Sequence, residues 1–284
     1  MNHLPDILGV NERNLKLIYE HNPTQHYPKA DDKLLTKEIL QAANIPAPKL
    51  LYSYRYFFEL DSLIEDLWGR ADFVIKPARG RGGGGILVCD RFQNGQWFTT
   101  SGRPYSAAKI LDHAIEILNG VYSMDNTDDA VMIEEKIQLH ECLDKVTYRG
   151  IPDIRVIVFE KTPIMAMLRL PTKCSEGRAN LHAGGIGIGI DLETGVTTSA
   201  KIKQRIIKTH PDTGAKLLGI KIPHWGTILN IAQAIQNDIP MGYMGIDFVI
   251  DKRYGPQILE CNVRPGLEIQ NINDKGLKKI LSEM

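Results

Sequence analysis

A glycine-rich segment beside basic side chains is the first candidate for chemistry in this sequence. The segment 79–85 (RGRGGGG) follows Lys76, and no acidic residue intervenes. Glycine backbone N–H groups can surround an anion, and Lys76, Arg79 and Arg81 supply positive charge at the same place. The segment therefore predicts a phosphate-binding loop, with a plain hairpin tip as the alternative. The lysine precedes the glycines and no Gly-Lys-Ser/Thr follows, which excludes a Walker loop and the protein-kinase arrangement.

Three oxygen-bearing side chains near the C-terminus form the second candidate. In the strand-like run 256–262, Glu260 and Asn262 share a face because side chains alternate along a strand. A hairpin with the run 243–250 places Asp247 opposite Glu260, about 5 Å apart at Cβ, where like charges destabilise each other. A bound cation reverses that effect, and oxygen donors suit Mg²⁺ that also binds phosphate. The alternative is the exposed polar face of an edge hairpin.

The metal prediction depends on the register of that hairpin. A turn centred between Arg253 and Tyr254 brings Asp247 opposite Glu260. A slip of one residue would send Asp247 to the other face of the sheet.

Two further stretches carry polar candidates. Asp153 and Arg155 fall on one strand face, either to contact a site that binds a polyanion and a metal or to form a structural ion pair. The polar loop 173–185 carries three side chains at alternating positions, which are Arg178, Asn180 and His182. A histidine in such a loop is more often a hydrogen-bonded structural residue than a catalytic base, so no role is assigned to His182.

Helix and strand signals alternate along the chain. Apolar spacing, caps and prolines predict helices at residues 31–43, 60–68, 106–119, 223–237 and 266–282. Buried or alternating apolar runs predict strands at residues 71–77, 86–90, 130–134, 153–160, 164–171, 184–192, 243–250 and 256–262. Short turns favour antiparallel neighbours. The predicted class is α+β with two lobes, divided into an N-terminal helical extension at 1–70, a small lobe with the glycine loop at 71–135, and a C-terminal lobe at 136–284.

Composition bounds the classes of function. The 284 residues are 43% hydrophobic and 24% charged, as in ordinary folded proteins. Lys and Arg total 34, and so do Asp and Glu, which argues against nucleic acid or an anionic membrane as the main partner. The four cysteines form no C-x-x-C pair, and neither a signal peptide nor a membrane span is visible. We therefore expect a reduced, cytoplasmic protein.

Taken in order, these segments resemble the ATP-grasp superfamily, in particular its RimK-like glutamate ligases and the sugar-transfer associated group. The resemblance covers roughly residues 30–270 and rests on an ordered set of motifs: DKLLTKEIL, NIPAPK, FVIKPARGRGGGG, MIEEKI, DIRV, GRANLHAGG, GIDFV and ILECNVRPG. It implies the ATP-grasp fold, in which two α+β lobes hold ATP. Only about 30 residues precede Lys33, so we expect the usual preceding domain to be short or missing.

The resemblance also implies roles for individual residues. Lys33 and Lys76 would contact ATP phosphates, and Asp153 would bind the ribose or nearby lysines. Arg178 and Asn180 would reach the γ-phosphate and the metal. The loop residues that would close over the phosphates are Arg79, Gly82, Gly83, Gly84 and Gly85, and those that would line the adenine pocket are Glu134, Glu135, Lys136 and Ile137. Asp247, Glu260 and Asn262 match the family's metal positions, which implies two Mg²⁺ ions, with Mn²⁺ as a substitute.

The implied reaction is ATP-dependent ligation of a carboxylate to an amine through an acylphosphate, with release of ADP and phosphate. Glutamate is one candidate amino acid for addition to a peptide or small molecule. Arg155 and Arg178 would offset charge on the reacting oxygens, and Arg264 would pair with a substrate carboxylate. Ala183 stands where RimK-type ligases commonly carry arginine. The alternatives are transfer to a sugar or cell-wall precursor and a non-catalytic nucleotide-binding subunit, and a homo-oligomer or a partner protein is also compatible.

Overall fold

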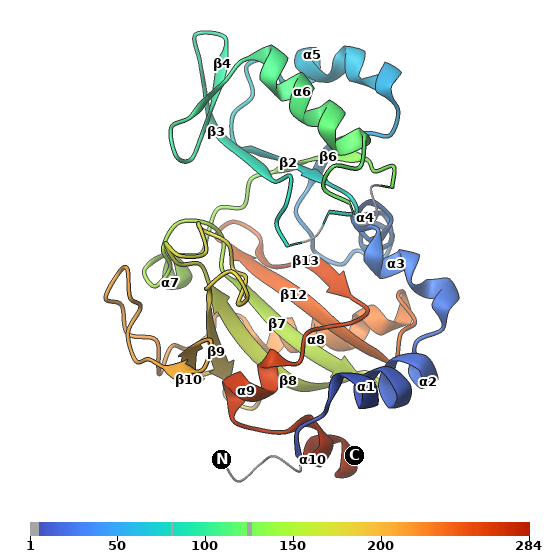
Figure 1. The fold of residues 1–284 in the computed structure, drawn as a ribbon, viewed down its shortest axis with the longest axis vertical. Coiled ribbons are helices and arrows are strands. Elements are labelled where there is room, and N and C mark those ends of the chain that lie inside the picture. Colours follow the sequence, from blue (N-terminus) through green and yellow to red (C-terminus); the bar gives the residue numbers. More distant parts are fainter. Residues whose placement is uncertain (1–5, 81, 124–126) are drawn as a thin grey trace. The chain divides into compact units, whose positions relative to one another are not determined.

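The protein consists of two compact units. A computed structural model describes residues 6–80, 82–123 and 127–284. The large unit contains residues 1–31, 38–47 and 138–284, and the small unit contains residues 32–37 and 48–137. Figure 1 shows that each unit contains its own sheet. Among the described residues, no helix has both the length and the apolar character needed to cross a membrane.

The small unit is built on a six-stranded antiparallel sheet. Its strands, in spatial order, are β1 (Leu50–Tyr54), β6 (Val131–Glu135), β2 (Phe73–Pro77), β3 (Leu87–Gln93), β4 (Gln96–Thr99) and β5 (Pro104–Tyr105). The strands expected at 71–77, 86–90 and 130–134 are confirmed as β2, β3 and β6. β2 and β3 flank the glycine loop, as the sequence predicted.

Helices cover one face of this small sheet. They are η4 (Phe57–Ser62), α5 (Leu63–Leu67) and α6 (Ala107–Leu118). The Ser106 hydroxyl accepts a hydrogen bond from Lys109 N and caps α6, and Gly120 follows the helix at φ 72°, a conformation that glycine adopts at low cost. Ile110 and Ile117 on α6 pack with Phe73 in the core of the unit. The helix predicted at 106–119 is confirmed.

The large unit is built on a seven-stranded antiparallel sheet. Its spatial order is β11 (Arg205–Ile206), β10 (Thr197–Ile202), β9 (Ile186–Ile190), β8 (Thr162–Leu170), β7 (Asp153–Phe159), β12 (Tyr243–Asp251) and β13 (Gly255–Asn262). The helices of this unit are α1 (Val10–Arg13), η2 (Asn14–Ile18), α2 (Tyr19–His21), η3 (Thr24–His26), α3 (Pro28–Asp31), α7 (Glu141–Asp144), α8 (Trp225–Ala234), η6 (Ile235–Asn237), α9 (Glu268–Asn273) and α10 (Leu277–Ser282).

The two faces of the large sheet have different surroundings. Even-numbered residues of β7, such as Ile154 and Val156, point into the main core with Ile228 of α8. On the opposite face, one half packs in a second apolar cluster with α9, α10 and residues of η2, to which Ile157 and Tyr243 belong. The other half of that face carries charged side chains instead. The sheet therefore presents one polar area beside an apolar one.

The β12–β13 hairpin corrects one detail of the predicted register. Asp247 pairs with Glu260, as expected, but Asp251 pairs with Gly255, so the turn is centred on Arg253. A register shift between Asp247 and Phe248 adds one residue on β13 and restores the expected pairing. Ile258 and Cys261 consequently both face the main core, although they are three residues apart. This β-bulge is what directs Glu260 to the face of Asp247.

The helices near the ends of the chain also differ from expectation. The single helix predicted at 266–282 is two helices, α9 and α10, because Asp274 adopts φ 52° after α9 and Gly276 precedes α10. α4 (Lys33–Ala42) matches the helix predicted at 31–43, and the Asp32 carboxylate caps it by accepting from Leu34 N and Leu35 N. α8 and η6 match the prediction at 223–237.

The unit boundaries differ from the three segments expected from the sequence. Residues 48–70 belong to the small unit, and residues 6–31 with 38–47 belong to the large one. The expected N-terminal extension at 1–70 is therefore shared between the units. The change from the small to the large unit falls after Ile137, two residues beyond the expected boundary.

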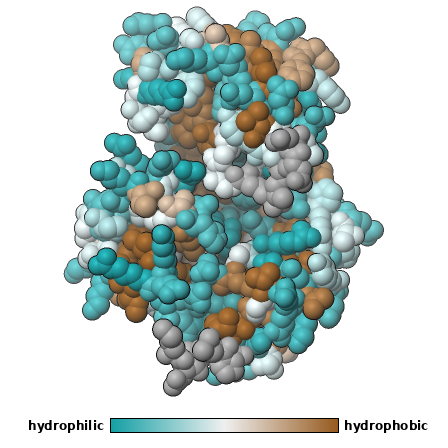
Figure 2. Space-filling view, in the orientation of Figure 1, coloured by the Kyte–Doolittle hydropathy of each residue, from teal (hydrophilic) through white to brown (hydrophobic). Residues whose placement is uncertain are grey.

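Figure 2 shows hydrophobic patches separated by hydrophilic residues on the visible face of the molecule.

Candidate active site

A buried cluster of two lysines and one carboxylate lies in the small unit. Glu134 on β6 is 3% exposed. Its Oε1 is 2.5 Å from Nζ of Lys37, and its Oε2 is 2.7 Å from Nζ of Lys76. Lys76 is on β2, next to β6, and Lys37 is on α4. Two ammonium groups share one carboxylate here, so the cluster has an excess of one positive charge.

Electrostatics within this cluster favour an anion close by. Burial tends to raise the pKa of Glu134, but Lys76 and Lys37 outweigh it and hold that pKa below its ordinary value. Burial lowers the pKa of Lys37 to about 8, although Glu134 opposes the shift. Glu134 therefore stays ionised at neutral pH, and a further negative charge near the lysines would stabilise them.

The start of the glycine loop is tied to α4. Lys33 N donates to Ala78 O, and Lys33 Nζ donates to Gly80 O at 2.8 Å. Arg79 Nε donates to Asp32 Oδ2 at 3.2 Å, and the Arg79 backbone N–H donates to Asp129. The first turn of α4 therefore holds one end of the loop, which places Lys33 and Arg79 beside it.

The glycines of the loop use conformations that other residues adopt at a cost. Gly82, Gly83 and Gly85 have φ between 63° and 81°, and a Cβ on Gly85 would lie 2.7 Å from the Tyr122 ring. Gly84 belongs to the same turn. Arg81, expected to add charge, lies outside the described residues.

The residues expected to line the adenine pocket follow the buried Glu134. The Glu135 backbone N–H donates to Lys49 O, and the Lys136 backbone N–H donates to Asp72 O. Lys136 Nζ is 3.2 Å from Asp72 Oδ1. Ile137 is the last residue of the small unit. The Glu134 carboxylate itself is engaged by the lysines, and the adenine assignment of these four residues stays a prediction.

A cluster of arginines and carboxylates occupies the polar half of the large sheet. Asp247 on β12 is 2% exposed, and it accepts two hydrogen bonds of 2.7 Å from Nε and Nη2 of Arg155 on β7. Arg169 Nη2 on β8 donates to the same carboxylate at 2.7 Å, and Arg169 Nε donates to Asp153 Oδ1 at 2.5 Å. Side chains from three adjacent strands thus form one network.

Each carboxylate in this network has a different balance of burial and charge. Burial tends to raise the pKa of Asp247, but Arg155 and Arg169 outweigh it and hold the pKa at about 2. Burial raises the pKa of Asp153 to about 6, against the attraction of Arg169. The two acids in turn raise the pKa of Arg169. Asp153 therefore has Arg169 as its ion-pair partner, where the family resemblance had implied the ribose or lysines.

The three expected metal-binding residues are brought together on one face. Glu260 lies opposite Asp247 in the hairpin, and Asn262 Nδ2 donates to Asp247 Oδ2 at 3.3 Å. Asp247 Oδ1 accepts one hydrogen bond, from Arg155 Nε, and a carboxylate oxygen can accept two. In the part of the chain that the structure describes, no three His, Cys, Asp or Glu side chains group for a metal. Two carboxylates completed by the Asn262 amide nevertheless match the oxygen chemistry of Mg²⁺.

The loop at 173–185 holds its polar side chains by local contacts. Arg178 Nη2 is 2.7 Å from Glu176 Oε2, and both side chains are exposed. Asn180 Oδ1 accepts from the backbone N–H groups of His182 and Ala183. The structure thus places Arg178 and Asn180 in a surface loop, and no contact that it shows joins them to Asp247. Their roles at a γ-phosphate stay predictions.

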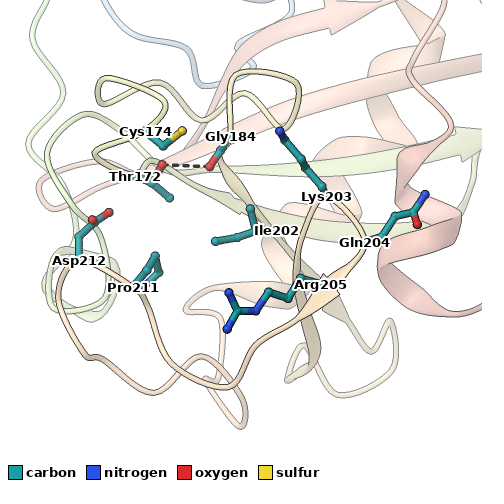
Figure 3. A pocket seen from close by; sticks show the side chains of 9 residues that line it. All are labelled: Thr172, Cys174, Gly184, Ile202, Lys203, Gln204, Arg205, Pro211 and Asp212. Carbon is teal, nitrogen blue, oxygen red and sulfur yellow. Dashed lines mark hydrogen bonds between the residues drawn. The ribbon is translucent and has the colours of Figure 1, made fainter.

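A pocket of about 530 Å³ opens beside this loop (Figure 3). Thr172 and Gly184, whose hydroxyl and carbonyl are hydrogen bonded at 2.9 Å, form one wall. Lys203, in the turn between β10 and β11, and Arg205, at the start of β11, form another wall, and Asp212 also lines the pocket. The pocket therefore carries both signs of charge.

Arg264 lies beyond the last strand. Its guanidinium carbon is 4.8 Å from the centroid of the Tyr27 ring, and the side chain is exposed. Pro265, the next residue, lies against Gly245 of β12, where a Cβ would be 2.7 Å from the proline ring. Gly245 therefore lets the segment after β13 pack on the sheet. The expected pairing of Arg264 with a substrate carboxylate stays a prediction.

Sequence reasoning missed two members of these clusters. Lys37 lies one helical turn after Lys33 in the same motif, so its spacing indicated the same helix face. Arg169 lies opposite Asp153 in the β7–β8 hairpin, which a register argument could have revealed. The expected Asp153–Arg155 face is confirmed, and Arg169 is the residue that joins Asp153 to Asp247.

Fold, glycine loop and charged clusters together define an ATP-grasp protein, and comparison with known proteins names the family. The chain belongs to the sugar-transfer associated ATP-grasp family, whose sequence model matches residues 12–284. The predicted membership of the ATP-grasp superfamily and the predicted α+β class are thereby confirmed. Membership implies ATP and a divalent metal in general terms.

The curated proteins that resemble this chain are distant relatives. The probable alpha-L-glutamate ligases of Legionella pneumophila strains Corby and Paris are each 24% identical over 263 residues. The match covers 91% of this chain and 65% of the relative. The chain thus spans just under two thirds of the length of these relatives.

Three solved structures are also similar. The D-alanyl-alanine synthetase A of Vibrio cholerae has 13% identity to this chain and a TM-score of 0.49. The match covers 91% of this chain and 64% of the synthetase chain. The D-alanine–D-alanine ligase of Bacillus anthracis has 16% identity, a TM-score of 0.44 and coverages of 89% and 62%. The ATP-grasp ligase PsnB, complexed with a minimal precursor, has 12% identity, a TM-score of 0.47 and coverages of 93% and 61%.

Proposed function

We propose that this protein is an ATP-dependent carboxylate–amine ligase that acts through an acylphosphate and releases ADP and phosphate. The observation that carries the proposal is the buried cluster in which Lys37 and Lys76 share the single carboxylate of Glu134. A buried excess of positive charge is costly unless an anion compensates it. In an ATP-grasp protein, that anion is the phosphate chain of the nucleotide.

The small unit provides the nucleotide contacts in this proposal. Lys76 and Lys33 bind the phosphates, and Lys37 holds Glu134 ionised and adds positive charge. Arg79 and the glycines 82–85 close over the phosphates with their backbone N–H groups. Residues 134–137 line the adenine. Lys33 gives up its bond to Gly80 O when it binds phosphate.

The large unit provides the metal ligands and the cations of the reaction. Asp247, Glu260 and Asn262 would hold Mg²⁺, in two ions, with Mn²⁺ as a substitute. The metal supplies charge that neutralises the reacting phosphate oxygens. Arg155 is oriented by its two hydrogen bonds to Asp247, so its remaining N–H groups are positioned without reorganisation. Arg169 is held by one hydrogen bond to Asp153 and one to Asp247. A contact of Asp153 with the ribose is also part of the proposal.

Two bond changes make up the reaction. An oxygen of the substrate carboxylate attacks the γ-phosphorus, and the bond between that phosphorus and the ADP oxygen breaks. The amine then attacks the acyl carbon, phosphate leaves, and the amine loses a proton. Arg155 and Arg178 offset negative charge on the phosphoryl and tetrahedral oxygens. The name of the curated relatives supports glutamate as one of the joined groups.

The family's description supports a second candidate, transfer to a sugar or cell-wall acceptor. A hydroxyl then replaces the amine in the second step, and the lysine and metal residues keep their roles. In both candidates the partners are small molecules or peptides. A subunit that binds the nucleotide without catalysis would need neither Glu260 nor Asn262.

Incubation with ATP, Mg²⁺ and pools of amino acids and peptides tests the proposal. ADP and phosphate that form only when a carboxylate and an amine are both present support the ligase. ADP with a hydroxyl acceptor supports the second candidate, and ATP binding without turnover in any pool contradicts both. We expect Glu260→Gln to abolish turnover with the fold retained, and near-normal turnover would exclude Glu260 as a metal ligand. Glu193→Gln, an exposed acid, is the matched control.

A further inference from the structure

Arg13 is a buried cation without an acidic partner. It is 7% exposed, and its guanidinium donates to neutral acceptors, Asn14 Oδ1 at 3.1 and 2.8 Å and Pro265 O at 2.7 Å. Within residues 6–80, 82–123 and 127–284, no carboxylate lies within ion-pair distance of it. Burial of an unpaired charge is costly, so the fold keeps Arg13 at an energetic disadvantage.

A second arginine stands beside the first. Arg264 precedes Pro265, the residue that Arg13 contacts, and it stacks over Tyr27 at 4.8 Å. It likewise has no ion pair with any side chain in the described part of the protein. Burial lowers the pKa of Arg13, and the charge of Arg264 lowers it further. The two positively charged guanidinium groups therefore repel each other, and no carboxylate in the described residues forms an ion pair with either.

Two tyrosine hydroxyls in the same region lack hydrogen-bond partners in the described structure. They belong to Tyr27, which stacks with Arg264, and to Tyr243, at the start of β12. Tyr243 is fully buried, and Asn22 fixes its backbone through bonds to Tyr243 O at 2.7 Å and from Tyr243 N at 2.9 Å. The charges of Arg13 and Arg155 act on its phenol. Buried hydroxyl groups almost always form hydrogen bonds, so each of these two can still donate one to a ligand.

We propose that Arg13, Arg264, Tyr27 and Tyr243 bind a carboxylate group of the substrate. This inference rests on the proposed ligase activity. Guanidinium groups match a planar carboxylate with paired N–H donors, and the phenols donate to its remaining lone pairs. Every acceptor that Arg13 now uses is neutral, so a carboxylate adds charge compensation that the protein does not supply itself.

The place of these residues in the sheet fits a substrate that reaches the metal ligands. Tyr243 and Asp247 lie on the same face of β12, four residues and therefore about 13 Å apart along the strand. Gly245 lies between them and carries no side chain. Arg13 lies on α1, and Tyr27 lies between η3 and α3. Both precede α4 and belong to the large unit (Figure 1), so this segment takes part in substrate recognition.

Succinate is a suitable probe, with neutral succinamide and inorganic phosphate as comparisons at matched ionic strength. Calorimetry and thermal unfolding of the wild-type protein should show succinate binding and a raised Tm, with no effect of succinamide. Arg13→Gln and Arg264→Gln should each weaken succinate binding about tenfold. Tighter binding of phosphate than of succinate at these residues would overturn the carboxylate assignment.

Tyr243→Phe separates binding from structure. Removal of an unpartnered buried hydroxyl should raise the Tm of the free protein, while succinate binding weakens about fivefold. A merely structural tyrosine would not combine these two effects. Arg91→Gln is the matched control, because Arg91 also stacks on an aromatic ring, Phe98, at 4.5 Å, and should leave succinate binding unchanged. Equal losses in the Arg91 and Arg13 variants would contradict the inference.

Failure of this inference can be told apart from failure of the proposed function. Lys76→Ala should lose affinity for the non-hydrolysable ATP analogue AMPPNP and keep succinate binding, and Arg13→Gln should do the reverse. A wild-type protein that binds succinate through Arg13 but does not bind the ATP analogue would contradict only the proposed function. One that turns over ATP but binds succinate equally well with Arg13→Gln would contradict only the inference.

Discussion

The two charged clusters of this protein differ in the cations that surround their carboxylates. In the small unit, two lysines share Glu134, which leaves one positive charge in excess. In the large unit, Arg155 and Arg169 are matched by Asp153 and Asp247, with hydrogen bonds in fixed directions. Lysine is a compact point charge, whereas arginine forms directed pairs. The first cluster is thus suited to attract an anion, and the second to hold side chains in place.

The largest effect that we expect comes from loss of the carboxylate shared by both arginines. Asp247→Ala should lower the free energy of unfolding by about 3–5 kcal/mol, because the largely buried Arg155 loses its ion-pair partner and Arg169 loses one of two. Urea unfolding measures this change. The exposed Glu193→Ala should change it by less than about 0.5 kcal/mol. If both variants change the free energy of unfolding equally little, the arginine cluster does not stabilise the fold.

The lysine cluster should make the free energy of unfolding depend on pH. The pKa of Lys37 is about 8 in the folded protein, below its ordinary 10.5, so the unfolded chain binds more protons between these values. The contribution of Lys37 to stability therefore rises as pH rises from about 8 to 10.5. At about 1.36 kcal/mol per pH unit, the full rise is on the order of 3 kcal/mol.

Comparison with Lys37→Met isolates this contribution from that of other titrating groups. Urea unfolding of both proteins at several pH values should show a steeper rise for the wild type in that range. Parallel curves would mean that Lys37 is solvated and that the cluster carries no buried excess charge.

A smaller effect tests whether the arginine cluster depends on direction as well as charge. Arg169 reaches Asp153 through Nε and Asp247 through Nη2, and a lysine has only one nitrogen for both. Arg169→Lys should therefore cost about 1–2 kcal/mol in the free energy of unfolding. Arg178→Lys, at an exposed ion pair, should cost close to nothing. Equal costs would remove the distinction drawn between the clusters.

The parts of this structure that the sequence predicted are those with strong local signals. The Ser106 cap and apolar spacing located α6, and alternation located the strands that carry Asp153 and Asp247. The pairing of Asp247 with Glu260 was correct, but through a shorter turn and a bulge. Turn length and bulges depend on tertiary packing, so periodicity alone cannot supply them.

The parts that the sequence did not predict depend on contacts between distant residues. Helical spacing and strand register indicate where Lys37 and Arg169 lie, but their roles follow from neighbours 16 to 97 positions away. The buried state of Arg13 likewise depends on Pro265, 252 positions later. The division of residues 6–70 between two units has a similar origin, because β1 pairs with β6, about 80 positions later, and residues of η2 pack with α9 and α10 near the end of the chain.

Titration with AMPPNP and Mg²⁺ by calorimetry tests the central claim most directly. Lys76→Ala should bind the analogue at least about tenfold more weakly than the wild type, because a charged phosphate contact is lost. Lys208→Ala, an exposed lysine of the large unit, should bind like the wild type. Equal affinity of the wild type and Lys76→Ala, with both proteins folded, would contradict the assignment of the lysine cluster to the nucleotide phosphates.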